Sequence, residues 1–180
     1  MKRENEYALL VKISEIMSRK GFVLSKMSLQ QLVYIFQDFY SVVLNYTFEL
    51  FTYGPYSVEL IDDLDHLFSE DMLMVEYCQG PEHFGSKILP GDRYKEAYIP
   101  CEDFLSLNDN RIRKLIELLG KYNAHQLELR GALIYLGRNK LASDSSLVEK
   151  IQIIKPYFTE LEIIKAVREL GLVKARNGEN

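Results

Sequence analysis

The sequence predicts an α+β fold that is predominantly α-helical, with a small antiparallel β element. Apolar residues recur at the three-to-four spacing of buried helix faces through most of the chain. Short alternating segments rich in β-forming residues are confined to the region between residues 47 and 99. We therefore predict a winged-helix-like part over residues 1–107, packed on a helical part over residues 108–180 as one compact unit.

Two helices are predicted at the start of the chain. The first spans residues 5–19, where an apolar stripe ends just before Gly21. The second begins at Ser28, which forms a capping-box pattern with Gln31, and its apolar face continues to about residue 44. So wide an apolar face predicts a helix that is buried on more than one side.

The rest of the N-terminal part has the order of a winged helix, in which a helix precedes a two-stranded wing. Gly54-Pro55 breaks the first strand, and Ser57 is placed to cap the helix that follows. The predicted elements are a strand at 47–52, a helix at 57–69, a strand at 72–78, a loop at 80–92 and a returning strand at 94–99.

The C-terminal part is predicted to be helical throughout. Asn123 and Asp144 are candidate N-caps for two of its helices. Thr159 and Glu162 form a capping box before the last helix, which Gly171 is placed to close. The predicted helices span residues 108–120, 123–138, 144–154 and 159–170.

Composition points to a globular protein outside the membrane. The 180 residues are 47% hydrophobic and 27% charged, near the average of globular proteins. No apolar run approaches the roughly 20 residues of a membrane span, and the first residues lack the pattern of a signal peptide. Cys78 and Cys101 are isolated, which is typical of a reducing compartment. We expect a cytoplasmic protein.

Charge is distributed unevenly along the chain. The net charge of −4 gives no global reason to expect nucleic acid as a partner. Residues 1–107 hold 9 Lys/Arg and 17 Asp/Glu, whereas residues 108–180 hold 13 Lys/Arg and 9 Asp/Glu. Either the two parts attract each other weakly, or the C-terminal part faces an acidic partner.

The sequence indicates no catalytic, metal or cofactor site. His66, His83 and His125 lie far apart, and none has a Cys or carboxylate at a known metal-ligand spacing. Residues 80–87 contain Gly and Lys but lack the spacing of a phosphate-binding loop. Adjacent acidic residues on a helix point in different directions and so form no acid/base pair by themselves. We expect no metal and no cofactor.

A winged helix normally places the helix before its wing in the major groove of DNA. Here the helix at 57–69 carries several acidic residues and no Lys or Arg, which disfavours contact with phosphates. A basic set in the C-terminal part keeps open a second interpretation, a winged-helix transcriptional regulator that contacts DNA through another face. That set consists of Arg111, Arg113, Lys114, Lys121 and Arg130.

An aromatic turn at residues 51–57 joins the helical start of the chain to the predicted winged-helix elements. It places three aromatic rings around Gly54-Pro55, and five tyrosines occur between residues 34 and 56. Tyrosine is favoured at protein interfaces because it offers rigid, half-polar contact area. The same rings could equally wall the core around the turn, and both interpretations stay open.

Several short motifs give the chain a family resemblance. They are Tyr53-Gly54-Pro55-Tyr56-Ser57 with the following Leu60, Asp63-Leu64 and Leu67, and the segments 28–34, 129–136 and 155–163. In these motifs the chain resembles the Panacea (SocA-like) antitoxin domain and its bacterial and archaeal relatives. The resemblance implies a mainly helical fold with a small β element, and an antitoxin-like regulatory role in prokaryotic or phage-associated settings. It implies no catalytic residues. The sequence departs from the group at Gln31, where Lys is frequent, and in its extended loop at 80–92.

The leading hypothesis is therefore a non-enzymatic regulatory protein that acts through protein–protein contacts. A basic protein partner, such as a toxin or a regulator, is predicted to bind the aromatic turn and the acidic helix after it. A third hypothesis is an enzyme with a site built from Tyr53, Tyr56 and Asp63. The residues predicted to bind the partner are Tyr53, Gly54, Pro55, Tyr56, Ser57, Glu59, Asp62 and Asp63.

Overall fold

The computed structural model describes residues 3–79, 84–137 and 144–177. Over these residues the chain forms seven α-helices, one 3-10 helix and four short strands. The strands make two separate antiparallel sheets of two strands each. The predicted α+β, mostly helical class is confirmed. Within the same ranges, no helix is long and apolar enough to cross a membrane.

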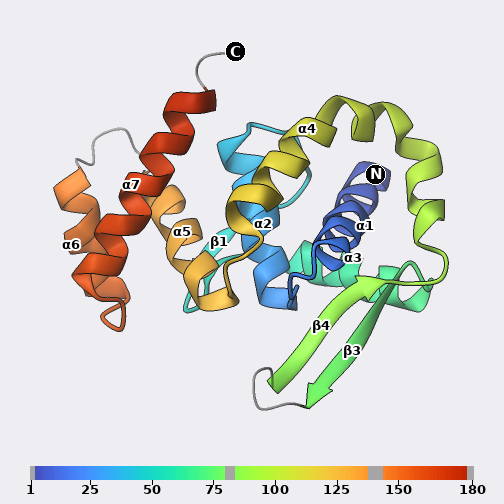
Figure 1. The fold of residues 1–180 in the computed structure, drawn as a ribbon, viewed down its shortest axis with the longest axis horizontal. Helices are drawn as coiled ribbons and strands as arrows, with labels where there is room; N and C mark the ends of the chain where they lie inside the picture. Colours follow the sequence, from blue (N-terminus) through green and yellow to red (C-terminus); the bar gives the residue numbers. More distant parts are fainter. Residues whose placement is uncertain (1–2, 80–83, 138–143, 178–180) are drawn as a thin grey trace.

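The two N-terminal helices form the centre of the fold. They are α1 (Glu4–Arg19) and α2 (Lys26–Phe39). α1 confirms the predicted first helix, and Gly21 follows it with a φ of 72°. α2 buries every residue from 28 to 36, as expected of a helix that is apolar on several sides. Figure 1 shows α2 running through the middle of the molecule, between α1 and the C-terminal helices.

The two ends of α2 differ from the prediction. Ser25, not Ser28, is the N-cap, because the Ser28 backbone N–H donates to Ser25 Oγ at 3.0 Å. The helix ends at Phe39, not near residue 44, because Ser41 has a φ of 53° that no α-helix accommodates. From residue 42 to 48 every second side chain is buried, so this segment crosses the core in an extended form.

A short hairpin follows, made of β1 (Glu49–Phe51) and β2 (Gly54–Tyr56), with Phe51 opposite Gly54. It confirms the predicted strand at 47–52 in part. The second strand lies where Gly54-Pro55 predicted a break, because Gly54 takes a φ of 96° and reverses the chain at once. Proline is tolerated here because β2 pairs on one side only.

Ser57 then caps α3 (Val58–Ser69) by accepting from the Leu60 backbone N–H at 3.4 Å, so this predicted cap and helix are confirmed.

A longer hairpin comes next, made of β3 (Leu73–Gln79) and β4 (Phe84–Pro90). Figure 1 shows it projecting from the body of the molecule. The predicted first strand is confirmed, but the returning strand lies inside the region 80–92 that we predicted to be a loop. β3 pairs with β4 over its whole length, from Leu73 opposite Pro90 to Gln79 opposite Phe84, which leaves no need for a later strand.

The segment predicted as the returning strand, 94–99, belongs instead to a 3-10 helix, η1 (Tyr94–Cys101). Ala97 and Cys101 are its buried residues, whereas Ile99, which a strand would place on the same face as both, is 72% exposed. η1 packs along α1, and the Tyr98 hydroxyl donates to Glu15 there at 3.0 Å. A short apolar segment of this kind is ambiguous between strand and helix.

Four helices complete the chain: α4 (Glu102–Leu119), α5 (Ala124–Gly137), α6 (Asp144–Ile154) and α7 (Glu160–Asn177). Reciprocal hydrogen bonds between Asn123 and Gln126 begin α5, and the predicted capping box of Thr159 and Glu162 begins α7. Gly171 does not close α7, which continues to residue 177; an exposed helix interior accepts one glycine at a cost of about 1 kcal/mol.

Buried apolar side chains form two clusters. The larger one lies between α1, α2, α3 and α4, and the smaller one joins α5, α6 and α7. The β1–β2 hairpin contacts both, because Phe48, just before it, lies in the first cluster and Leu50 packs against the second. The hairpin is therefore placed at the junction between the two cores.

Candidate binding surface at the first hairpin

The β1–β2 hairpin has three residues in each strand, too few to be stable without outside contacts. Two consecutive glutamines of α2 hold its β2 edge. Gln30 makes a reciprocal pair with the Ser57 backbone, with its Nε2 2.9 Å from Ser57 O and its Oε1 3.0 Å from Ser57 N. Gln31 Nε2 donates to the backbone O atoms of Tyr53 at 3.1 Å and Pro55 at 3.0 Å. The two side-chain amides thus replace a third strand on this edge.

Two glycines make room for the Gln31 amide. A Cβ added at Gly54 would lie 2.7 Å from Gln31 Oε1, and one added at Gly131 of α5 would come even closer. Such a Cβ at Gly131 would also lie 3.1 Å from Pro55 Cδ. Gln31 is therefore enclosed between α2, the hairpin and α5. Within the described residues its Oε1 has no hydrogen-bond donor.

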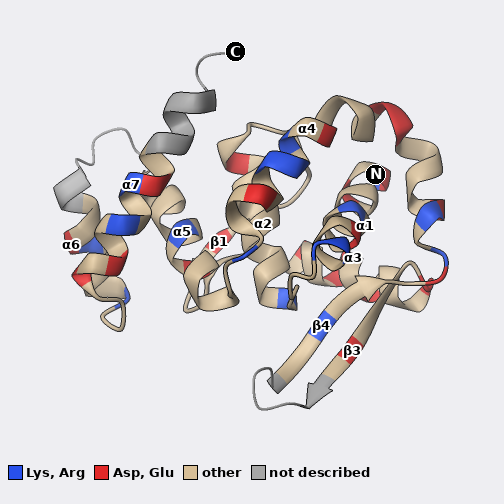
Figure 2. Cartoon of the chain, in the orientation of Figure 1, with Lys and Arg blue, Asp and Glu red and all other residues tan. Residues whose placement is uncertain are grey.

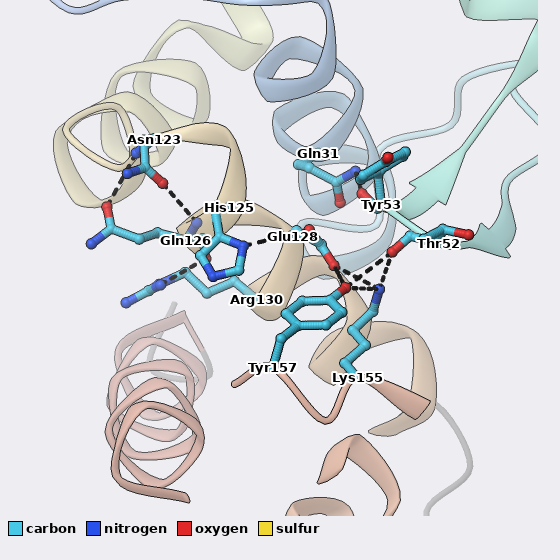
Figure 3. A network of polar contacts seen from close by, with 10 residues as sticks. All are labelled: Gln31, Thr52, Tyr53, Asn123, His125, Gln126, Glu128, Arg130, Lys155 and Tyr157. Atoms are coloured by element: carbon cyan, nitrogen blue, oxygen red, sulfur yellow. Dashed lines mark hydrogen bonds and ion pairs between the residues drawn. The ribbon is translucent and has the colours of Figure 1, made fainter. Parts of the chain in front are cut away.

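The turn of the hairpin, at Thr52, is held by the connection between α6 and α7. Lys155 Nζ donates to Thr52 O at 2.6 Å, to Glu128 Oε1 at 2.7 Å and to the Tyr157 hydroxyl at 3.2 Å, which uses all three of its protons (Figure 3). Lys155 is 2% exposed and Glu128 is 5% exposed. An unpaired charge at this depth would cost several kcal/mol, so each ion depends on the other.

Two aromatic residues cover this buried ion pair. The Tyr157 hydroxyl hydrogen-bonds Glu128 and lies 3.2 Å from Thr52 O. Burial, and then Glu128, raise the pKa of Tyr157, so the phenol keeps its proton. His125 stacks on Phe158 with centroids 4.3 Å apart and places its Nδ1 3.9 Å from Glu128 Oε2. Tyr157 and the His125 side chain are both about half exposed to solvent, at 50% and 52%.

The rigid hairpin leaves aromatic rings exposed. Phe51 and Tyr53 are 53% and 66% exposed, Tyr157 is 50% exposed and Tyr56 is half-buried. The Phe51 and Tyr56 rings meet edge to face, with centroids 5.6 Å apart. We call these four residues the hairpin patch. They come from two segments separated by about a hundred residues, and the contacts around Thr52 bring these segments together.

The residues predicted to bind a partner fall into two groups. Tyr53, Tyr56 and Asp62 reach the surface, and Glu59 is half-buried and accepts a hydrogen bond from the Ser57 hydroxyl at 2.6 Å. The other members contribute to the frame instead of the surface: Gly54, Pro55 and Ser57 are buried in the hairpin and at the α3 cap.

Asp63 is also buried, on the inner face of α3. Its Oδ2 accepts from Arg3 Nη1 and from the Tyr46 hydroxyl, both at 2.9 Å. Burial raises the pKa of Asp63, although both donors act in the opposite direction. Because these contacts occupy the carboxylate, the structure does not assemble Tyr53, Tyr56 and Asp63 into one site.

Two of the five members of the basic set pair with carboxylates among the described residues. Arg130 is buried and ion-paired with Glu169, and Arg113 pairs with Asp109 at 2.6 Å. Figure 2 shows basic and acidic residues interleaved along α4. The remaining members are Arg111, Lys114 and Lys121. An interleaved surface of this kind offers no continuous track of positive charge for a phosphate backbone.

The described residues contain no group of three or more His, Cys, Asp or Glu side chains that could hold a metal ion. The His66 ring packs on Tyr7 with centroids 5.1 Å apart. Cys101 is buried, and burial raises the pKa of its thiol. His83 and the Cys78 side chain lie outside the described residues.

Sequence reasoning missed the residues that hold the hairpin. We predicted Gln31 to form part of a capping box, which is wrong, and we assigned no role to Glu128, Lys155 or Tyr157. A buried lysine has no local signature, because its acceptors at Thr52 and Glu128 are 103 and 27 residues away. A scan against protein-family models and a search of curated proteins each found no match to the chain, so this surface is interpreted from its own geometry.

Proposed function

We propose that this chain is a protein-binding regulatory module of the antitoxin-like kind that its motifs resemble, and that the hairpin patch is its contact surface. One observation supports this most: a hairpin too short to stand alone is held at its β2 edge and at its turn by buried side chains, yet it exposes aromatic rings. A turn that only reverses the chain direction does not need these hydrogen bonds from buried side chains.

The physical advantage of such a surface is pre-organisation. Binding is weakened by the entropy lost when side chains and loops become ordered. A hairpin whose backbone is already held loses little conformational entropy on binding. Tyrosine also loses little, because it has few rotatable bonds for its contact area. Aromatic residues are also frequent among the few that supply most of the binding energy at protein interfaces.

The partner that suits this surface is a basic protein. The exposed carboxylate of Glu49 lies opposite Tyr56 on the hairpin, and Asp62 is exposed on α3. The part of the chain that contains the hairpin, residues 1–107, holds 17 Asp/Glu against 9 Lys/Arg. Opposite charge on a partner would raise the rate of encounter and fix its orientation. We place this interaction in the cytoplasm, in keeping with the isolated cysteines.

The test combines photocrosslinking with measured affinity. A photoreactive phenylalanine replaces Tyr53 in the full chain, the crosslinked protein is identified, and its Kd is measured with purified components. We expect Phe51→Ala with Tyr53→Ala to weaken binding at least tenfold, because truncation of central aromatic residues typically costs about 2 kcal/mol or more.

A matched control is available on the second hairpin, where Tyr77 is 79% exposed. Tyr77→Ala should leave the Kd unchanged, and circular dichroism should show native helix content for every variant. If the patch double variant binds as tightly as the wild type, or if Tyr77→Ala weakens binding equally, the hairpin patch is not the contact surface.

A further inference from the structure

Resting on the proposed function, we propose that the outward face of the β1–β2 hairpin binds an arginine side chain of the protein partner. The face consists of Glu49, Phe51 and Tyr56. Glu49 lies directly opposite Tyr56 in the strand register, and Phe51, two residues further along β1, shares the face with Glu49. All three side chains therefore meet solvent on one side of the hairpin.

The chemistry of this face suits a planar cation. Phe51 and Tyr56 meet edge to face with rings inclined by 67°, and Phe51 is 53% exposed, so ring surface is accessible to a ligand. A guanidinium stacks on such a surface and, at the same time, presents paired N–H groups that match the two oxygens of a carboxylate. Glu49 supplies that carboxylate one strand away. A lysine ammonium, a compact and strongly hydrated charge, uses such a combination less fully.

The chain repeatedly uses the same three components in its own interior. Arg130 Cζ lies 3.6 Å from the centroid of the Tyr122 ring while its guanidinium pairs with Glu169. Two further sets combine a cation, a tyrosine ring and a carboxylate: Arg3 with Tyr46 and Asp63, and Lys12 with Tyr98 and Glu15. In each of them the cation of the chain occupies the place between ring and carboxylate.

The hairpin face has the rings and the carboxylate without such a cation. Among the residues that the structure describes, no Lys or Arg forms an ion pair with Glu49 or lies over the ring of Phe51 or Tyr56. Lys155, which is bound to the neighbouring Thr52, is buried and directed to Glu128. The face is therefore complementary in charge to an arginine that arrives from outside.

The experiment titrates the full, isotopically labelled chain with three short peptides and follows backbone amide signals by NMR. The peptides contain three arginines, three citrullines or three lysines, each residue separated by glycine. Citrulline keeps the size of arginine and removes its charge. We expect saturable shifts at residues 49–56 with the arginine peptide, weaker shifts with the lysine peptide and none with the citrulline peptide.

Two substitutions test the assigned side chains. Glu49→Gln and Phe51→Leu should each weaken the arginine peptide about two- to fivefold, the effect of an exposed ion pair or cation–π contact of up to about 1 kcal/mol. Glu76→Gln on the second hairpin, where the carboxylate already pairs with Lys87 at 3.0 Å, should change nothing. Both altered side chains on the face are exposed, so unfolding is not expected, and amide spectra will verify this for each variant.

Several outcomes would overturn the proposal. Equal binding of the citrulline peptide removes the role of charge, equal binding of the lysine peptide removes the preference for arginine, and an unchanged Kd for Glu49→Gln removes the assigned carboxylate. Shifts at residues 49–56 that depend on protein concentration without peptide would assign the face to a second copy of the chain. If crosslinked partner binding requires Phe51 and Tyr53 while the arginine peptide fails to bind, this inference is wrong and the proposed function stands. If the arginine peptide binds while the Kd of the protein partner does not depend on the hairpin patch, the proposed function is wrong and the arginine site stands.

Discussion

The two hairpins of this protein are stabilised in opposite ways. β3 and β4 pair over seven residues each. Leu73 and Ile88 bury their base in the main core, Ile88 N donates to Leu24 O at 2.7 Å, and the rest of the hairpin projects from the body (Figure 1). β1 and β2 pair over three residues and depend on Gln30 and Gln31 at the β2 edge and on Lys155 at the turn.

The difference shows how stability can be moved from a strand ladder to side chains. A long hairpin gains enough from its own hydrogen bonds and cross-strand pairs to extend away from the core. A short hairpin gains little from either and must be built into its surroundings. The short hairpin therefore holds its exposed rings on a fixed backbone. Substitutions on the long hairpin should affect stability only locally.

The largest effect is expected for Lys155→Met. It leaves Glu128 buried without its cation and Thr52 O without its ammonium donor, and breaking a buried ion pair from one side typically costs about 3–5 kcal/mol. Urea unfolding measures the loss in the free energy of unfolding. Lys150→Met, at an exposed position of α6, is the control and should change it by about 0.5 kcal/mol or less. A loss below about 1 kcal/mol for Lys155→Met would mean that the buried ion pair of Lys155 and Glu128 does not hold the hairpin.

The next effect is expected for Gln31→Glu compared with Gln31→Lys. Glutamate replaces the donor to Tyr53 O and Pro55 O by an acceptor, and each carbonyl left without a donor costs about 1–3 kcal/mol. Lysine supplies protons to the same two carbonyls, so Gln31→Lys should be the more stable variant in chemical denaturation. Equal stability of the two variants would contradict the assigned direction of these hydrogen bonds.

A smaller effect is expected for Gly131→Ala. The added methyl group would overlap the Gln31 amide and press on Pro55, and overpacking of this kind costs about 1–3 kcal/mol. Gly171→Ala provides a matched control in α7, where no atom lies within 4 Å of an added Cβ, and should stabilise the protein by about 0.4–1 kcal/mol. Thermal unfolding of the two variants should therefore shift in opposite directions.

The smallest effect is expected on the long hairpin. Glu76→Ala removes a cross-strand ion pair with Lys87 in which the two side chains are 50% and 29% exposed, so the loss should be about 0.2–1 kcal/mol. Hydrogen exchange should show faster exchange in β3 and β4 alone. If exchange in β1 and β2 also accelerates, the two hairpins are coupled and the contrast between them is weaker than their contacts suggest.

Much of the fold follows from the sequence alone because its causes are local. The apolar spacing of α1, α3 and the C-terminal helices repeats within a few residues. The caps at Ser57, Asn123 and Thr159 act within three residues of themselves, so their residue types are enough to place the starts of α3, α5 and α7. The aromatic turn could be singled out for the same reason, since its rings and its Gly-Pro lie in one stretch.

Tertiary structure decided what the turn became. Whether Gly54-Pro55 breaks a strand or begins one depends on distant residues. Gln31 donates to the carbonyls of Tyr53 and Pro55, 22 and 24 residues after it, and Lys155 donates to the carbonyl of Thr52, 103 residues before it. The same holds for Asp63, which the sequence places on an acidic helix and which Arg3 and Tyr46 take into the interior. Buried polar groups take whichever partners the packed chain brings to them, and those partners have no fixed distance in sequence. The sequence by itself therefore determined where helices start and where aromatic rings gather, while packing decided which of these side chains form the frame and which form the surface.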